Sequence, residues 1–170
     1  MLVGPDFAQA YVRATENLKP VFGTSGYVGI IPGSGTLANE VAIRAMLDEG
    51  QTALILDAGY FSNVLKKSVE GCGATAVLMP VPEGQPADPE AVRAALSQQK
   101  YDLLRFTHVE TSTRLQQPVE ALAKIATDAG VPIMVDGVSA LGTSPAKMGE
   151  NAQIEAMNSV ILGIEGSMSR

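Results

Sequence analysis

Val135-Asp136-Gly137-Val138-Ser139 ends a short apolar run that starts at Pro132, and it places a carboxylate where a buried strand is expected to end. In open α/β folds, ligands bind at the edge of the sheet where the carboxyl ends of parallel strands meet. A buried carboxylate costs free energy unless a partner compensates, for example a protonated ring nitrogen. Asp136 therefore has two interpretations: it binds a nitrogen-containing ligand, or it caps the following turn. Val138 is then suited to pack on a flat ligand, and Ser139 to donate a hydrogen bond or to stabilise the turn.

A second motif, Gly33-Ser34-Gly35-Thr36, lies between a predicted strand and a predicted helix. Glycine lets the backbone approach a ligand closely, and the free N–H groups and dipole of a helix N-terminus favour a phosphate there. The alternative is a tight turn that needs glycine for geometry alone. The motif lacks the third glycine of a dinucleotide fingerprint and the Gly-Lys-Ser/Thr ending of a Walker loop.

Strands and helices alternate along the chain, which indicates an α/β fold with a mostly parallel sheet and helices on both faces in three layers. We expect strands at 27–31, Thr52–Asp57, 75–79, 102–109 and 132–135, and helices at 7–18, 36–48, Tyr60–Glu70, from Asp88 to about Gln98, and 118–129. Residues 154–157 suggest a helix and 160–164 a last strand. The 170 residues suit a single domain (1–170), which we expect to be cut from a longer unit.

Composition narrows the class of partner and the compartment. The net charge of −6 and pI of about 4.7 argue against binding to a nucleic acid. The apolar runs are too short to span a membrane. One cysteine, Cys72, allows no internal disulfide, so we expect a cytoplasmic protein in which Cys72 is a packing residue.

Further candidate residues fall at the same predicted edge of the sheet. Tyr60 starts a helix, where it either stacks on a ligand ring or is a core or rim aromatic. His108 is the only histidine, which excludes a metal site built on histidines and favours a structural role. Thr111, Ser112 and Thr113 follow it and offer hydroxyl groups to a ligand.

Taken together, the motifs resemble the class V aminotransferases, fold-type I pyridoxal-phosphate enzymes close to alanine–glyoxylate and serine–glyoxylate aminotransferases. The motifs occur in the family's order, over about residues 5 to 150. They are Val21-Phe22-Gly23-Thr24, Pro32-Gly33-Ser34-Gly35-Thr36, His108-Val109-Glu110-Thr111-Ser112-Thr113 and Val135-Asp136-Gly137-Val138-Ser139-Ala140-Leu141-Gly142.

The resemblance implies a role for each matched residue in holding pyridoxal 5′-phosphate. Ser34, Gly35 and Thr36 would bind the phosphate, and Asp136 would pair with the pyridine nitrogen. The remaining residues implied to bind the cofactor are Tyr60 on one face of the ring, Val138 on the other, and Thr111 at the ring hydroxyl. The implied activity moves an amino group between a small amino acid of the alanine or serine type and glyoxylate or another 2-oxo acid. A homodimer or higher oligomer is implied as well. The resemblance also implies that residues 1–170 form the large, cofactor-binding domain and that the family's C-terminal small domain is absent.

Two departures from the family pattern bear on activity. The family's Schiff-base lysine lies in a Gly-Ser-x-Lys context, and the nearest match here, Gly166-Ser167-Met168-Ser169, has Ser169 where lysine belongs. Lys147 falls too early in the chain to replace it. The catalytic residue is therefore unknown, and the alternative is an inactive fragment or partner subunit that binds pyridoxal phosphate or a homologous chain. Arg114 stands where the family usually has glycine, and we expect it to crowd the pocket.

Overall fold

The computed structural model describes residues 4–140 and the backbone of residues 157–161. In chain order the elements are α1 Pro5–Phe22, α2 Gly35–Met46, β1 Thr52–Asp57, α3 Tyr60–Glu70, β2 Thr75–Pro80, α4 Pro89–Gln98, β3 Leu103–Thr107, β4 Val109–Glu110, β5 Leu115–Gln116, α5 Val119–Asp128, β6 Ile133–Asp136 and β7 Met157–Ile161. None of the helices in these residues is long and apolar enough to cross a membrane.

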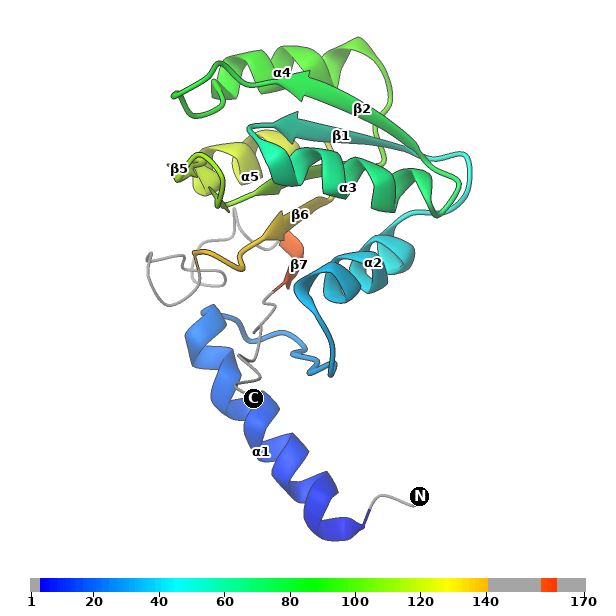
Figure 1. Ribbon diagram of the computed structural model, residues 1–170, viewed down its shortest axis with the longest axis vertical. Helices are drawn as coiled ribbons and strands as arrows, with labels where there is room; N and C mark the ends of the chain where they lie inside the picture. Colours follow the sequence, from blue (N-terminus) through cyan, green and yellow to red (C-terminus); the bar gives the residue numbers. More distant parts are fainter. Residues whose placement is uncertain (1–3, 141–156, 162–170) are drawn as a thin grey trace.

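Among the described residues, five parallel strands form the main sheet in the order β2-β1-β3-β6-β7 (Figure 1). The chain moves outward from β1 to β2 and then returns to β3 on the other side of β1. This reversal places a topological switch point at the carboxyl ends of β1 and β3. A separate antiparallel pair, β4 and β5, follows directly after β3. The predicted α/β class with a mostly parallel sheet is confirmed.

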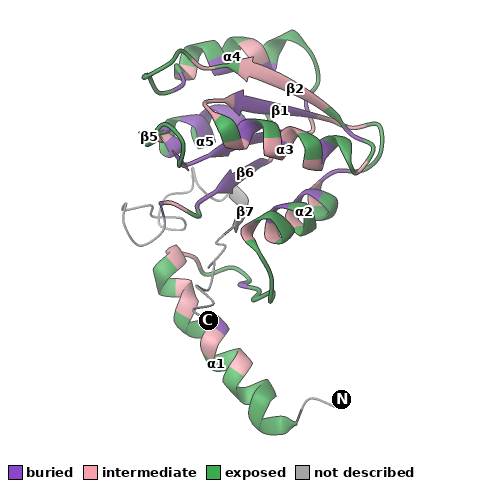
Figure 2. Cartoon of the chain, in the orientation of Figure 1, coloured by how far each residue is buried: buried purple, intermediate pink, exposed green. Residues whose placement is uncertain are grey.

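The strands carry near-continuous hydrophobic runs, so apolar side chains cover both faces of the sheet and are buried there by helices. One core cluster packs the sheet against α4 and α5, and the other packs it against α2 and α3. Figure 2 shows the buried residues gathered on β1 and β6, whereas α1 is exposed along most of its length. The result is the expected three-layer arrangement, with α1 extending away from it (Figure 1).

Most predicted elements are confirmed, and two of them have the predicted bounds: Thr52–Asp57 and Tyr60–Glu70. The predicted cap of α4 is also present, since Oδ1 of Asp88 accepts a hydrogen bond from the Glu90 N–H at 3.0 Å. These predictions rest on strong local signals. For β1 the signal is an apolar run bounded by turn residues, and for α4 it is a capping aspartate followed by proline in the first turn.

The predicted strand at 27–31 is wrong, because this segment has no regular structure. Its backbone at Ile30 instead bonds to the side chain of Tyr11 on α1: the Tyr11 hydroxyl accepts from the Ile30 N–H at 3.0 Å and lies 3.3 Å from the Ile30 carbonyl. Tyr27 is 92% exposed. A β-branched run becomes a strand only when a neighbouring strand pairs with it.

Three other predicted bounds are corrected. The strand predicted at 102–109 is two strands, β3 and β4, which belong to different sheets. Helix α1 continues to Phe22, past the predicted end at residue 18, and stops at Gly23, whose φ is 58°. Met157, predicted at a helix end, starts strand β7. Residues 154–156 and 162–164 lie outside the described residues.

Candidate active site

The N-terminus of α2 faces the carboxyl edge of the sheet. Ser34 is the N-cap of this helix, and its Oγ accepts a hydrogen bond from the Leu37 N–H at 3.2 Å. Gly35 and Thr36 form the first turn, and both line a cavity of about 240 Å³. The first N–H groups of a helix have no acceptor inside it, so this turn is suited to bind an anion.

Asp136, the last residue of β6, lines the same cavity and is 5% exposed. Its Oδ1 accepts from the Val138 N–H at 3.1 Å, and its Oδ2 accepts from Nδ2 of Asn39 at 3.0 Å. The carboxylate therefore caps the turn and borders the cavity, so the two interpretations of Asp136 are compatible. Each of its oxygens retains a lone pair for a further donor.

Asn39, which lines the cavity, and Arg105, which does not, support Asp136, and the sequence motifs single out neither residue. The guanidinium of Arg105 donates from Nη2 to Oδ1 of Asn39 and from Nε to the Met134 sulfur at 3.3 Å. Arg105 is fully buried, and this burial lowers its pKa to about 9, while the charge of Asp136 acts in the opposite direction. The available signal was a charge inside the apolar run Leu103-Leu104-Arg105-Phe106.

The wall of the cavity between α3 and the end of β3 carries hydroxyl and aromatic groups. Thr111 and Ser139 come together, with their hydroxyl oxygens 2.6 Å apart, and both line the cavity. Thr107 also lines it, and its buried Oγ1 has no hydrogen-bond partner among the described residues. An orphaned buried hydroxyl at a cavity wall is suited to bind a polar ligand atom.

The aromatic residues at the start of α3 differ in position. Phe61 lines the cavity, whereas Tyr60 does not, and the side chain of Tyr60 is 66% exposed. The two rings pack edge to face, with centroids 5.3 Å apart. Val138 lines the cavity and is 39% exposed. The geometry thus places a candidate ring contact at Phe61, which we had not singled out from the sequence.

Two further residues near the predicted edge of the sheet do not line the cavity. His108 is buried, does not line the cavity, and has its Nε2 3.4 Å from Nε2 of Gln116. Burial lowers the pKa of its imidazole. Arg114 is exposed and does not line the cavity, so the expectation that it crowds the pocket is wrong. Its φ of 59° accounts for the glycine that is usual there, since this conformation favours glycine.

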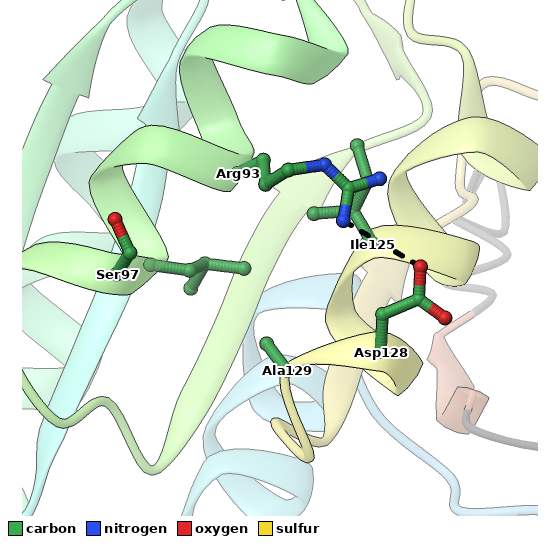
Figure 3. Close-up of a pocket in the computed structure, with 6 residues that line it drawn as sticks. Arg93, Ser97, Ile125, Asp128 and Ala129 are labelled. Atoms are coloured by element: carbon green, nitrogen blue, oxygen red, sulfur yellow. Dashed lines mark ion pairs between the residues drawn. The ribbon is translucent and has the colours of Figure 1, made fainter.

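A second hollow, of about 350 Å³, lies between α4 and α5 on the opposite face of the sheet (Figure 3). Arg93 and Asp128 form an exposed ion pair across it, with Nη1 and Oδ2 3.5 Å apart. This hollow lies away from the carboxyl ends of the strands. We therefore assign the candidate site to the cavity beside Asp136.

A family model described as aminotransferase class-V matches residues 3–153. This chain belongs to the class V aminotransferase family. An uncharacterized aminotransferase of Methanocaldococcus jannaschii is 32% identical over 140 residues, which are 81% of this chain and 36% of that protein. A serine–glyoxylate aminotransferase of Methylorubrum extorquens is 32% identical over 151 residues, which are 85% of this chain and 38% of that protein.

The crystal structure of an alanine–glyoxylate aminotransferase from Nostoc sp. matches this class V chain with a TM-score of 0.81 and 31% identity. The match covers 85% of this chain and 39% of the Nostoc chain. The chain thus spans less than two fifths of the length of each of these three proteins. Class V aminotransferases depend on pyridoxal 5′-phosphate, the cofactor expected from the motifs.

The described residues fit this cofactor chemically. A helix N-terminus suited to a phosphate and a buried carboxylate suited to a ring nitrogen border one cavity, with hydroxyl groups and Phe61 between them. The cavity is smaller than the roughly 300–1,000 Å³ of drug-sized ligand pockets, which favours a small single-ring ligand over a dinucleotide. Lys147 and Ser169 lie outside the described residues.

Proposed function

We propose that this chain forms the cofactor-binding part of an aminotransferase, which moves an amino group between a small amino acid of the alanine or serine type and glyoxylate or another 2-oxo acid. The observation that carries the proposal is that Asp136 and the first turn of α2 border one cavity. Pyridoxal phosphate, when bound, would supply an aldehyde that takes up and releases the amino group and a ring that withdraws electrons from the substrate. Named relatives of the chain act on glyoxylate, which supports this class of acceptor.

The protein's own residues have distinct roles in this proposal. Ser34, Gly35 and Thr36 bind the phosphate through N–H and hydroxyl donors at the start of α2. Asp136 accepts a hydrogen bond from the pyridine nitrogen and keeps a proton on it. Thr111, held by its hydrogen bond to Ser139, contacts the ring hydroxyl.

Different residues are proposed to contact the two faces of the ring. Val138 packs against one face, since it lines the cavity next to Asp136. Tyr60 is proposed for the other face, and Phe61, which lines the cavity, supports the ring on that side. Replacing Tyr60 and Phe61 with leucine one at a time shows which of them stacks on the ring. Only the substitution of the stacking residue should change the absorbance of the bound cofactor.

A second candidate function follows if no lysine reaches the cofactor. None of the described residues that line the cavity is a lysine. A lysine amine is needed for the covalent link to the cofactor aldehyde and for moving the substrate proton. Without it, the chain would be an inactive partner subunit that holds pyridoxal phosphate, or a homologous chain, without turnover.

Cofactor binding is tested by titrating purified protein with pyridoxal phosphate and following absorbance and fluorescence. Asp136→Ala should weaken binding about 10- to 100-fold, the effect of losing a hydrogen bond to a charged group. Asp128→Ala is the matched control, since it removes a carboxylate from the distant hollow. Equal affinity in the wild type and Asp136→Ala, or no binding at all, would contradict the proposal.

Borohydride reduction of the complex, followed by peptide mass spectrometry, then separates the two functions. A cofactor-labelled lysine, lost on substitution of that residue, supports an active transaminase. Reversible binding with no labelled lysine and no amino transfer from alanine or serine to glyoxylate supports the non-catalytic subunit.

We also propose that the protein is a homodimer or larger oligomer. Exposed apolar side chains gather on α1, on the segment before α2, and on α2 itself. They are Phe7, Val12, Val21, Tyr27, Ile30, Ile31, Leu37 and Val41. Such groups on a soluble protein mark interaction surfaces, and the family resemblance makes a second copy the expected partner.

A further inference from the structure

Arg105 occupies an unusual position at the centre of the sheet. It lies in the middle of β3, in register with Ile55 on β1 and Met134 on β6, and its side chain has no exposed surface. Its neighbours on this face are apolar residues of the cluster between the sheet and α2 and α3. Burying a guanidinium there costs several kcal/mol of desolvation, which an apolar residue of similar size would avoid. Stability alone therefore does not account for Arg105.

The polarity of its hydrogen bonds shows what the arginine does. A guanidinium has donors and no acceptor, so the Asn39 atom that meets Nη2 of Arg105 is the amide oxygen. This fixes which way the Asn39 amide is turned, and its NH₂ group then faces Oδ2 of Asp136 at 3.0 Å. The donors run in one direction, from Arg105 through Asn39 to Asp136, and end on a carboxylate that must accept.

Arg105 acts at a distance from the cavity. Asn39 and Asp136 line the cavity, whereas Arg105 does not. Nη1 of Arg105 has no partner among the described residues, so the guanidinium is not fully compensated by hydrogen bonds. Its lowered pKa of about 9 still leaves it charged at neutral pH. The hydrogen-bond chain therefore holds Oδ2 of Asp136 as an acceptor and fixes the position of the carboxylate.

We propose that Arg105 is a positioning residue that acts through Asn39 to hold Asp136 as a hydrogen-bond acceptor at the cavity, ready for the protonated nitrogen of a pyridine ring. The inference rests on the proposed function, because it concerns the same cavity. The inference adds a residue that does not touch the cofactor. The affinity of Asp136 for the ring nitrogen depends on the buried cation of Arg105, which reaches Asp136 only through Asn39.

The test compares two probes that differ at the ring nitrogen. Arg105→Met and the wild type are titrated with pyridoxal 5′-phosphate and with 1-deazapyridoxal 5′-phosphate, in which carbon replaces the nitrogen. Arg105→Met should weaken binding of pyridoxal phosphate about tenfold, the effect of losing an outer partner of a binding group. Binding of the deaza compound should change less than about twofold, since its ring makes no hydrogen bond with Asp136.

Matched variants separate positioning from packing. Ile55→Val perturbs the neighbouring strand on the same face, and it should leave the ratio of the two affinities at its wild-type value. Arg105→Lys keeps a cation and a donor, so it should restore part of the selectivity for pyridoxal phosphate. The double variant Arg105→Met with Asn39→Ala should be no worse than Asn39→Ala alone, since both residues act in one chain.

Each result is decisive. Equal weakening of both probes by Arg105→Met, or no weakening of either, overturns the positioning role while leaving the proposed function intact. Failure of the wild type to bind pyridoxal phosphate overturns both. If Arg105→Met does not fold, the comparison is made with Arg105→Lys and Asn39→Ala, and unchanged selectivity in both overturns the inference.

Discussion

The side chain of Glu110 lies against Gly59 so closely that a β-carbon on Gly59 would be 2.7 Å from the Cγ of Glu110. The same β-carbon would be 2.6 Å from Oγ of Ser112. This hydroxyl donates to Oε1 of Glu110 at 2.7 Å and accepts from the Tyr60 N–H at 3.2 Å. The contact thereby joins the start of α3 to the loop between β4 and β5, which carries Thr111.

Gly59→Ala should therefore push this loop away from α3. We expect a loss of about 1–3 kcal/mol in the free energy of unfolding, the usual cost of overpacking, measured by urea denaturation. Gly29→Ala is the control, since a β-carbon there would make an ordinary contact of 3.5 Å with Tyr27. Equal stability of the two variants would show that Glu110 and Ser112 move aside at no cost.

His108 should make stability depend on pH below neutrality. Burial lowers the folded-state pKa of its imidazole, so the unfolded chain takes up the proton first as pH falls. The stabilising contribution is complete above the unfolded pKa of about 6.5 and is lost as pH falls toward the folded value. His108→Asn should lose less stability than the wild type between pH 7 and 5. Parallel curves for the two proteins would exclude this role.

Arg114→Gly should stabilise the protein. Arg114 has a φ of 59°, in the left-handed region, which costs a residue with a β-carbon about 1–2 kcal/mol. Glycine has no such penalty, although it also increases the entropy of the unfolded chain, so we expect a net gain of about 1 kcal/mol or less. Arg114→Ala keeps the penalty and should show no gain in chemical denaturation. A gain in both variants would assign the effect to the lost charge instead.

The exposed apolar segment before α2 should hold copies of the chain together. Tyr27 and Ile31 are 92% and 49% exposed, which leaves them available to a partner surface. Sedimentation equilibrium should show an oligomer for the wild type and a shift toward monomer for Tyr27→Ser with Ile31→Asp. Gln99→Asp, at the exposed end of α4, should not change the mass. A monomeric wild type would remove this proposal.

The elements that could be predicted from the sequence are those whose signals are local. β1 is a buried apolar run, and α3 is bounded by glycines, so their limits follow from neighbouring residues. The segment 27–31 has the same local character as a strand, but no strand in the described part of the chain pairs with it, and pairing depends on residues far along the chain. The split of the run 102–109 into two sheets has the same origin.

The candidate site divides in a similar way. Gly35, Thr36, Thr111, Asp136 and Val138 could be found from motifs, and the structure brings them to one cavity. Asn39 and Arg105 could not, because their contacts join residues 97 and 66 positions apart and depend on the register between β3, β6 and α2. A charge in a buried strand signals a compensating partner without saying which residue it is.

Ser34 has two roles that a matched pair of substitutions separates. Its Oγ caps α2, so Ser34→Ala should cost about 1 kcal/mol of stability, and Asp88→Ala should cost a similar amount at the cap of α4. If Ser34 also binds the cofactor phosphate, its replacement should weaken pyridoxal phosphate but not pyridoxal, which lacks the phosphate. Asp88→Ala should leave both affinities unchanged, because α4 lies on the other face of the sheet. Loss of stability in Ser34→Ala without a selective loss of pyridoxal phosphate affinity would limit Ser34 to capping and leave the phosphate to Gly35 and Thr36.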